Sequence, residues 1–305
     1  MKVIVGLGEL LWDLLPEGAR LGGAPANFTV MAARLGNRGV IASRLGEDAL
    51  GAQARAVLAP FPVDTGQIQS DSTHSTSTVT VEFHQNEPHY IIHEPVAWDF
   101  LAFTPEWHAL AQQADAVCFG SLAQRSPATR ETMHRFLAAT RPDCVRVFDV
   151  NLREPFFSAE VVAQSLQLAT IFKLNESEVP QVLAMLGGKA AGTDEASLRA
   201  AAGWLLERYP MQLVAITLGG EGSLLVSREG THRRQGIRGT VSDTVGAGDA
   251  FTAAMVDAYL RGASLARMNE AGNRWGAWVA SQRGAMPDLP ETTKSEIQNR
   301  IAEVE

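Results

Sequence analysis

Short apolar segments that alternate with amphipathic helical patterns are the feature that most restricts the fold of this chain. The apolar segments, each of a length typical of a buried strand, are residues 3–8, 39–46, 116–120, 145–150, 171–175 and 213–219. Between two of them, Phe28, Met31, Ala32 and Leu35 share one helical face, and Gly36 follows as a stop signal. Strands that alternate with helices form a mostly parallel sheet with helices on both faces. The sequence therefore predicts a doubly wound α/β fold.

The composition is that of a globular protein with a large core. Hydrophobic residues make up 46% and charged residues 20% of the 305 positions, and the formal net charge is −8. An excess of negative charge argues against binding to nucleic acid or to an anionic membrane surface, but not against a small anion held by backbone amides. We therefore expect neither nucleic acid nor a membrane among the partners.

The amino-terminal segment lacks the features of an export signal. Residues 1–13 are too short and become acidic too soon for a signal peptide, and the chain has no apolar run of about 18 residues. Cys118 and Cys144 both lie in apolar segments, which favours buried free thiols in a reducing compartment over a disulfide. These features predict a cytoplasmic protein.

One segment interrupts the alternation of strands and helices. Residues 72–100 are rich in β-branched side chains, alternate in places between apolar and polar residues, and contain turn residues at 85–88. This pattern predicts a β-hairpin inserted into the α/β body. Such a hairpin either covers the carboxyl ends of the parallel strands, where ligands bind in these folds, or forms an ordinary edge.

A glycine-rich turn directly precedes another helical pattern, in VSDTVGAGDAFTAAMVDAYLRG at 241–262. The free N–H groups at a helix N-terminus favour an anion, and the small residues Gly246, Ala247 and Gly248 let it approach closely. Asp249 is then either a first-turn acid that stabilises the helix or a base that accepts a proton from a hydroxyl nucleophile. The second interpretation matches phosphoryl transfer, which needs both an anion site and a base.

Two other phosphate-binding motifs are absent or incomplete in this chain, which argues against two rival enzyme classes. The chain contains no G-x-x-x-x-G-K-[ST] sequence, which argues against a P-loop nucleotidase. Gly6-Leu7-Gly8, at the end of the first predicted strand, lacks the third glycine of the dinucleotide-binding fingerprint. A nicotinamide-dependent dehydrogenase is therefore the weaker interpretation.

Two long motifs resemble the signatures of the PfkB family of carbohydrate kinases, also called ribokinase-like kinases. They are GGAPANFTVMAARLG at 22–36, with SRLGEDALG at 43–51, and DTVGAGDAF at 243–251. Shorter similarities follow the family order at 8–16, 148–153, 173–178 and 217–225, so the resemblance spans nearly the whole chain. Within the family, GGAPAN is most similar to the bacterial fructokinases.

The resemblance implies one ribokinase-like domain over residues 1–305, with a small β-sheet lid inserted at about 9–21 and 72–99. The sugar is expected beneath the lid, ATP across the carboxyl ends of the later strands, and Mg²⁺ beside the phosphates. Asp249 is expected to be the general base, and the amides of Gly246, Ala247 and Gly248 to stabilise the transferred phosphoryl group. Lids of this family often pair, so a homodimer through the lid is expected.

The resemblance also assigns residues to binding roles. The expected sugar contacts are Asp13, Gly22, Gly23, Asn27, Tyr90 and Asp249. The expected nucleotide contacts are Asn175, Thr217, Gly219, Gly222, Gly246, Gly248 and Asn273. Glu178 is expected to hold Mg²⁺ through waters, and Asp243 to hold a monovalent cation such as K⁺ with carbonyls near Gly284. Arg153 either reaches the phosphates as a catalytic residue or is a surface arginine.

The identity of the sugar is less constrained. Ala24-Pro25 stands where ribokinases and phosphosugar kinases of the family place Lys-Gly, and the absence of lysine favours a neutral, unphosphorylated sugar. Residues 90–93 lack the arginine with which sugar-acid kinases bind a carboxylate, which makes an acidic sugar less favoured. Fructokinases often carry an arginine there too, so fructose is supported by the GGAPAN segment and not by residues 90–93. The resemblance therefore predicts a fructokinase. The alternatives are a 2-keto-3-deoxygluconate kinase, a ribokinase, a nucleoside kinase and a non-catalytic sugar sensor.

Overall fold

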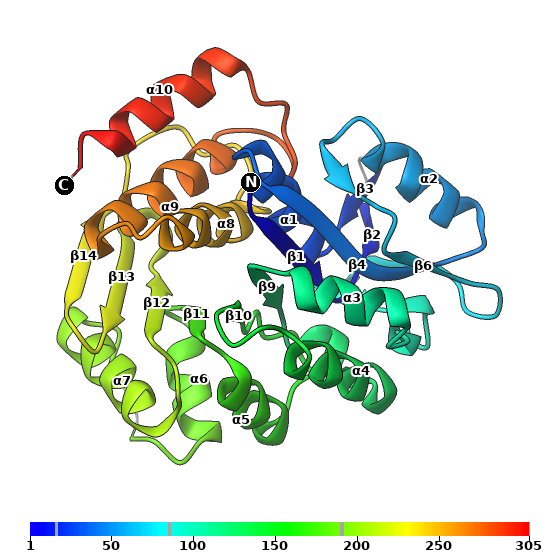
Figure 1. The fold of residues 1–305 in the computed structure, drawn as a ribbon, viewed down its shortest axis with the longest axis horizontal. Coiled ribbons are helices and arrows are strands. Elements are labelled where there is room, and N and C mark those ends of the chain that lie inside the picture. Colours follow the sequence, from blue (N-terminus) through cyan, green and yellow to red (C-terminus); the bar gives the residue numbers. More distant parts are fainter. Residues whose placement is uncertain (16–17, 85–86, 190–191, 305) are drawn as a thin grey trace.

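The structure, a computed structural model, describes residues 1–15, 18–84, 87–189 and 192–304, and the side chains of residues 81–90 lie outside this description. Within these ranges the chain forms a ten-stranded sheet, a four-stranded sheet and the helices around them (Figure 1). The strands of the large sheet are β1 (Val3–Leu7), β4 (Arg38–Gly46), β5 (Val63–Asp64), β6 (Ile68–Asp71), β9 (Ala116–Phe119), β10 (Val145–Asp149), β11 (Ile171–Asn175), β12 (Leu213–Thr217), β13 (Gly222–Ser227) and β14 (Thr231–Gln235).

The large sheet extends in two directions from β1. Its order is β14-β13-β12-β11-β10-β9-β1-β4-β5, and β6 also pairs with β4. The pairs from β12 to β5 and β6 are parallel, whereas β13 and β14 form an antiparallel edge. The chain passes from β1 to β4 and later returns to β9 on the other side of β1, so the boundary of β1 and β9 is the switch point where ligands bind in such sheets. The predicted doubly wound, mostly parallel sheet is confirmed.

Helices cover both faces of this sheet, as Figure 1 shows. One face carries α1 (Ala24–Arg34), α8 (Ala247–Leu260), α9 (Leu265–Ala280) and α10 (Glu291–Ala302). The other face carries α3 (Pro105–Gln113), α4 (Pro127–Ala138), α5 (Ala159–Leu168), α6 (Glu178–Met185) and α7 (Glu195–Arg208). A further helix, α2 (Ala49–Leu58), packs against β4. Short 3-10 turns occur at Ala97–Phe100, Leu122–Arg125 and Gly219–Glu221.

Alternating side chains of the central strands fill two hydrophobic cores, one under each layer of helices. On β1, Val5 and Leu7 belong to the core shared with α3 to α7, whereas Ile4 belongs to the core shared with α1, α8 and α9. Successive side chains of a strand point to opposite faces, so a strand covered on both faces is apolar throughout. This requirement explains why the strands appear in the sequence as uninterrupted apolar segments.

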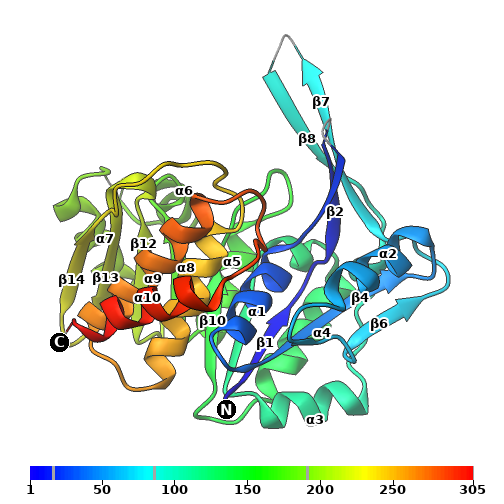
Figure 2. The ribbon, with the colours of Figure 1, turned by 90° about the horizontal axis from the view of Figure 1, so that it is seen from above.

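A separate four-stranded sheet stands beside the large one. Its strands are β2 (Leu11–Leu15), β3 (Gly18–Gly22), β7 (Ser77–His84) and β8 (Glu87–Ile92), in the order β3-β2-β7-β8. The antiparallel pair β7 and β8 is the hairpin predicted within residues 72–100, and β2 pairs with β7 in parallel. Figure 2 shows β7 and β8 extending away from the body of the molecule. The predicted small sheet is therefore confirmed.

Both cysteines of the chain lie inside the protein. Cys118 and Cys144 are buried and unpaired, as expected. Among the helices of the described residues, none is both long enough and apolar enough to cross a membrane.

Candidate active site

The predicted glycine-rich turn brings the N-terminus of α8 to the carboxyl edge of the large sheet. Gly246 precedes the helix with a left-handed φ of 78°. A Cβ at this position would lie 2.6 Å from the Cα of Ala285, so the turn requires glycine. Because glycine has no side chain, it cannot cap the first amides of α8. Unpaired amides at a helix N-terminus favour an anion, but the N–H of Ala247 donates a 3.2 Å hydrogen bond to the carbonyl oxygen of Thr244 in this structure.

The carboxylate of Asp249, in the first turn of α8, is turned toward α1. Its Oδ2 accepts a hydrogen bond of 2.8 Å from Nδ2 of Asn27. Burial, followed by the neighbouring carboxylate of Asp149, raises the pKa of Asp249 from 3.8 to about 6, although Asn27 and Lys173 oppose this rise. A carboxyl group with a pKa close to the working pH is suited to accept a proton in a reaction.

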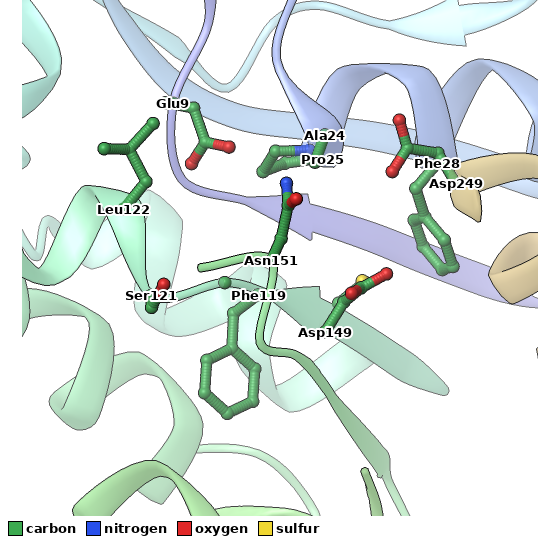
Figure 3. Close-up of a pocket in the computed structure, with 12 residues that line it drawn as sticks. Glu9, Ala24, Pro25, Phe28, Phe119, Ser121, Leu122, Asp149, Asn151 and Asp249 are labelled. Atoms are coloured by element: carbon green, nitrogen blue, oxygen red, sulfur yellow. The ribbon is translucent and has the colours of Figure 1, made fainter. Parts of the chain in front are cut away.

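Asp249 lines a small cavity together with other polar side chains. Figure 3 shows these lining residues as sticks. The cavity measures about 10 Å³, which is close to the smallest space that holds one water molecule. Its lining includes Glu9, Asp149, Asn151 and Asp249. The lining residues come from the carboxyl ends of β1, β9 and β10 and from the starts of α1 and α8. This is the switch point of the sheet, the expected place for a ligand.

No role was predicted for two of these side chains, Glu9 and Asn151, although they lie in the family-like segments at 8–16 and 148–153. Glu9 is only 3% exposed, its Oε2 has no hydrogen-bond partner among the described residues, and burial followed by the charge of Asp249 raises its pKa to about 7. Asn151 has a left-handed backbone with a φ of 38°. Both are polar residues just beyond a buried strand, β1 or β10. That position at the carboxyl edge is the signal that would have identified them.

The residues expected to bind the sugar make close contacts around the start of α1. Gly23 precedes α1, and a Cβ there would lie 2.5 Å from the carbonyl oxygen of Glu9. A Cβ at Gly22 would lie 2.7 Å from Oδ2 of Asp13. These two glycines therefore allow β3 and the start of α1 to approach both acidic residues. The side chain of Tyr90 lies outside the described part of the structure.

Arg153 lies beside the site with an exposed side chain. Its Nη1 donates a hydrogen bond of 3.1 Å to the carbonyl oxygen of Leu152. Burial raises the pKa values of Glu9, Asp13 and Asp249, and the positive charge of Arg153 lowers all three. Arg153 is thus exposed and within electrostatic range of all three carboxyl groups, and its expected contact with the phosphates stays a prediction.

Asn175 and Glu178 organise the turn between β11 and α6. Oδ1 of Asn175 accepts hydrogen bonds of 3.0 Å from the backbone N–H groups of Ser177 and Glu178. In return, Glu178 accepts hydrogen bonds from the N–H groups of Asn175, at 2.7 Å, and Leu152, at 2.9 Å. The Glu178 carboxylate therefore ties this turn to the loop that carries Arg153.

Three of the expected nucleotide contacts, Thr217, Gly219 and Gly222, lie at or just beyond the carboxyl end of β12. Asn273 has a different environment. It is 8% exposed on α9, and its Nδ2 donates to Oγ of Ser223, at 2.6 Å, and to the carbonyl oxygen of Asn269, at 2.7 Å. Its amide nitrogen is therefore occupied inside the protein, as a link between α9 and β13.

Asp243, expected at a monovalent cation site, is bound by an arginine. Its Oδ2 lies 3.1 Å from Nη1 of Arg20 and accepts a 3.1 Å hydrogen bond from the N–H of Gly284. Its Oδ1 accepts a 3.0 Å hydrogen bond from the N–H of Val245. Since Arg20 belongs to β3, this ion pair joins the small sheet to the loop that leads into α8.

Comparison with known proteins decides the family. The sequence profile of the pfkB family carbohydrate kinases matches residues 18–292. The chain belongs to this family. A fructokinase of Escherichia coli is 31% identical to this kinase over 305 residues, which cover 93% of this chain and 95% of the relative. The predicted family and its kinase activity are thus confirmed.

Solved structures of this family superpose on nearly the whole chain. A sugar kinase of Pyrococcus horikoshii in complex with ATP has a TM-score of 0.81 and 27% identity, and the match covers 99% of this chain and 100% of that one. A fructokinase of Vibrio cholerae with bound fructose, ADP and calcium has a TM-score of 0.78 and 25% identity, with coverage of 97% and 98%. The protein is an ATP-dependent sugar kinase.

Proposed function

We propose that this kinase transfers the γ-phosphoryl group of ATP to a primary hydroxyl group of a neutral sugar, and that the sugar is fructose. The main support for this reaction is the position of the Asp249 carboxylate in the first turn of α8, close to the amides at the start of that helix. Phosphoryl transfer requires such a base together with donors for the transferred group. Fructose is supported by the similarity to fructokinases of Escherichia coli and Vibrio cholerae.

The charge of the site supports a neutral substrate. Glu9, Asp13 and Asp249 place three carboxyl groups around the start of α1, and Arg153 is the exposed cation that acts on all of them. Carboxylates accept hydrogen bonds from sugar hydroxyls, but they repel the carboxylate of a sugar acid or the phosphate of a sugar phosphate. A neutral ketohexose therefore fits the site better than either acidic substrate.

In the proposed reaction, Asp249 accepts the proton of the attacking hydroxyl group. The amides of Gly246, Ala247 and Gly248 donate hydrogen bonds to the phosphoryl oxygens as charge develops on them, while Asp13 and Asn27 bind other hydroxyl groups of the sugar. A general base typically contributes about a hundred- to ten-thousand-fold to the rate. One donor of an anion hole contributes about a hundred- to a thousand-fold.

The residues at the end of β11 fit a Mg²⁺ ion held through waters. Glu178 is buried, and its two oxygens accept hydrogen bonds from the amides of Leu152 and Asn175, but each carboxylate oxygen has a further lone pair for a water. When bound, Mg²⁺ supplies positive charge to the phosphate oxygens of ATP. Asp243 is different, because Arg20 already provides the positive charge there. A K⁺ ion held by Asp243 and carbonyls near Gly284 remains part of the proposal, supported by a Vibrio cholerae fructokinase solved with fructose, ADP and potassium, and it would share the Asp243 carboxylate with Arg20.

We also propose that the small sheet is a lid over the sugar and that two copies of the chain pair through it. Its edge strands, β3 and β8, each have one neighbour within the described residues, which leaves backbone groups open to a second sheet. Size-exclusion chromatography with light scattering tests this pairing. We expect the mass of a dimer, and a monomer at all concentrations would refute the pairing.

A coupled assay of ADP formation tests the substrate. We expect Mg²⁺-dependent ADP formation with fructose, and much lower kcat/KM with ribose, tagatose, 2-keto-3-deoxygluconate and nucleosides. Preference for an acidic sugar would refute the charge argument, and preference for another neutral sugar would replace fructose. Calorimetric binding of a sugar without any ADP formation would indicate a sensor in place of an enzyme.

A further inference from the structure

Lys173 is a charged residue at a position where the strand pattern requires an apolar one. In β11 it follows Ile171 by two residues, so both side chains point toward the face covered by α8 and α9. Lys173 is nevertheless only 7% exposed. Its Nζ lies 3.1 Å from Oδ1 of Asp149, at the end of the neighbouring strand β10. A buried lysine costs stability unless it has a charged partner, so a role for this pair is expected.

The ammonium group of Lys173 lies directly beneath the first turn of α8. A Cβ at Gly248 would lie 3.3 Å from Nζ of Lys173. Asp149 extends the connection, because its Oδ2 lies 3.2 Å from Oγ1 of Thr252, which is 2.9 Å from the carbonyl oxygen of Gly248. The ion pair is therefore attached to the same helical turn that carries Asp249.

Acidic groups surround this ammonium from several elements. Asp149 of β10, Asp249 of α8 and Glu178 of α6 each act on Lys173, and together they outweigh the effect of burial and raise the pKa of Lys173 above its ordinary value. Glu9, beyond β1, and the thiol of Cys118 on β9 face the same group of charges, and the exposed Arg153 acts from outside. Lys173 is therefore charged at neutral pH and compensates carboxylates that would otherwise repel one another.

We propose that Lys173 is a positioning residue for phosphoryl transfer, whose ammonium group places a fixed positive charge beneath Gly248 and beside Asp249. This inference rests on the proposed role of Asp249 as the base. The charge favours the ionised base and adds to the dipole of α8 at the point where negative charge develops during transfer. A side chain at position 248 would crowd this ammonium group, since its Cβ would lie 3.3 Å from Nζ of Lys173.

The two partners of the ion pair act on Asp249 in opposite directions, which gives a specific test. Asp149 raises the pKa of Asp249 and Lys173 lowers it. Lys173→Met should therefore raise this pKa and Asp149→Asn should lower it. Both shifts can be measured without substrate, by carbon NMR titration of labelled aspartate carboxyls, with the Asp249 signal identified by its absence in Asp249→Asn. These shifts show whether the ion pair acts on the charge of Asp249, and the kinetics show whether that action matters for phosphoryl transfer.

Kinetics provide the second measurement. With the sugar that gives the highest turnover, Lys173→Met should lower kcat at neutral pH about tenfold or more while the KM for sugar changes little, because the charge acts mainly in the transition state. Since Lys173→Met leaves Asp149 unpaired, the double variant Lys173→Met/Asp149→Asn provides an uncharged pair whose folding is checked by circular dichroism. We expect it to fold, to titrate close to the wild type, and to keep the low kcat.

The outcomes separate this inference from the proposed function. An unchanged pKa of Asp249 in both single variants, or shifts in the same direction, would overturn the role of Lys173 even if the wild type phosphorylates fructose. Wild-type kcat in the double variant would also overturn it. Failure of the wild type to phosphorylate any sugar would refute the proposed function, while the NMR titration would still decide whether Lys173 acts on Asp249.

Discussion

Replacing the base should make the protein more stable, because Asp249 is held in an environment that disfavours its charge. The pKa of Asp249 is raised from 3.8 to about 6, first by burial and then by Asp149. A shift of about 2 units corresponds to about 3 kcal/mol at 1.36 kcal/mol per unit. For a carboxyl group with a raised pKa, the stability contribution is complete below the unfolded pKa and is lost as the pH rises through the folded value.

Asp249→Asn removes this loss, since asparagine carries no charge. The carboxamide oxygen can still accept the hydrogen bond that Nδ2 of Asn27 now donates to Asp249 at 2.8 Å. The variant should therefore match the wild type near pH 4 and exceed it by up to about 3 kcal/mol above about pH 7. A catalytic group that is retained at the expense of stability is a known feature of enzymes.

Urea unfolding of the ligand-free protein between about pH 4 and about pH 8 measures this difference. Glu131→Gln is the matched control, because Glu131 is exposed on α4 and loses the same charge without the burial. Its unfolding free energy should change by less than about 0.5 kcal/mol. A gain for Asp249→Asn that does not depend on pH, or a loss of stability at about pH 8, would show that Asp249 is not destabilised by its charge.

Three further predictions concern the turn, the base and the small sheet. Gly246→Ala should lower kcat at least about a hundred-fold, because its Cβ would lie 2.6 Å from the Cα of Ala285; near-normal kinetics would show that the turn tolerates a side chain. The acidic limb of kcat/KM against pH should have its midpoint near 6, the raised pKa of Asp249, and a flat profile would contradict an ionised base. Arg20→Ala should cost less than about 1 kcal/mol, since the pair with Asp243 is partly exposed, but should raise the KM for sugar if β3 helps to cover it. An unchanged KM would show that this ion pair does not hold the small sheet over the sugar.

Features encoded by neighbouring residues could be predicted from the sequence. The alternation of apolar strands with helical patterns was enough for the doubly wound sheet, because a strand covered on both faces must be apolar. The β-branched segment at 72–100 was enough for the hairpin of β7 and β8. The glycine-rich start of α8 was also a local prediction, made because small residues admit an anion, whereas the left-handed backbone of Gly246 was not predicted.

Contacts between distant residues could not be predicted in the same way. Arg20 and Asp243 are 223 positions apart, and their ion pair depends on how the small sheet stands against the loop before α8. Lys173 and Gly248 meet because β11 packs beneath α8, which no local pattern records. Asn273 was expected to contact the nucleotide. Its hydrogen bonds to Ser223 and Asn269 could not be predicted, because they depend on the packing of α9 against β13.

The role of Asp249 as the general base is tested by comparing sugar-dependent ADP release by the wild type and by Asp249→Asn, with sugar affinity measured by calorimetry on the same preparations. We expect kcat to fall about a hundred- to ten-thousand-fold while the dissociation constant for the sugar stays nearly the same. Turnover by Asp249→Asn close to that of the wild type would contradict this role, because the proton of the attacking hydroxyl would then be accepted elsewhere.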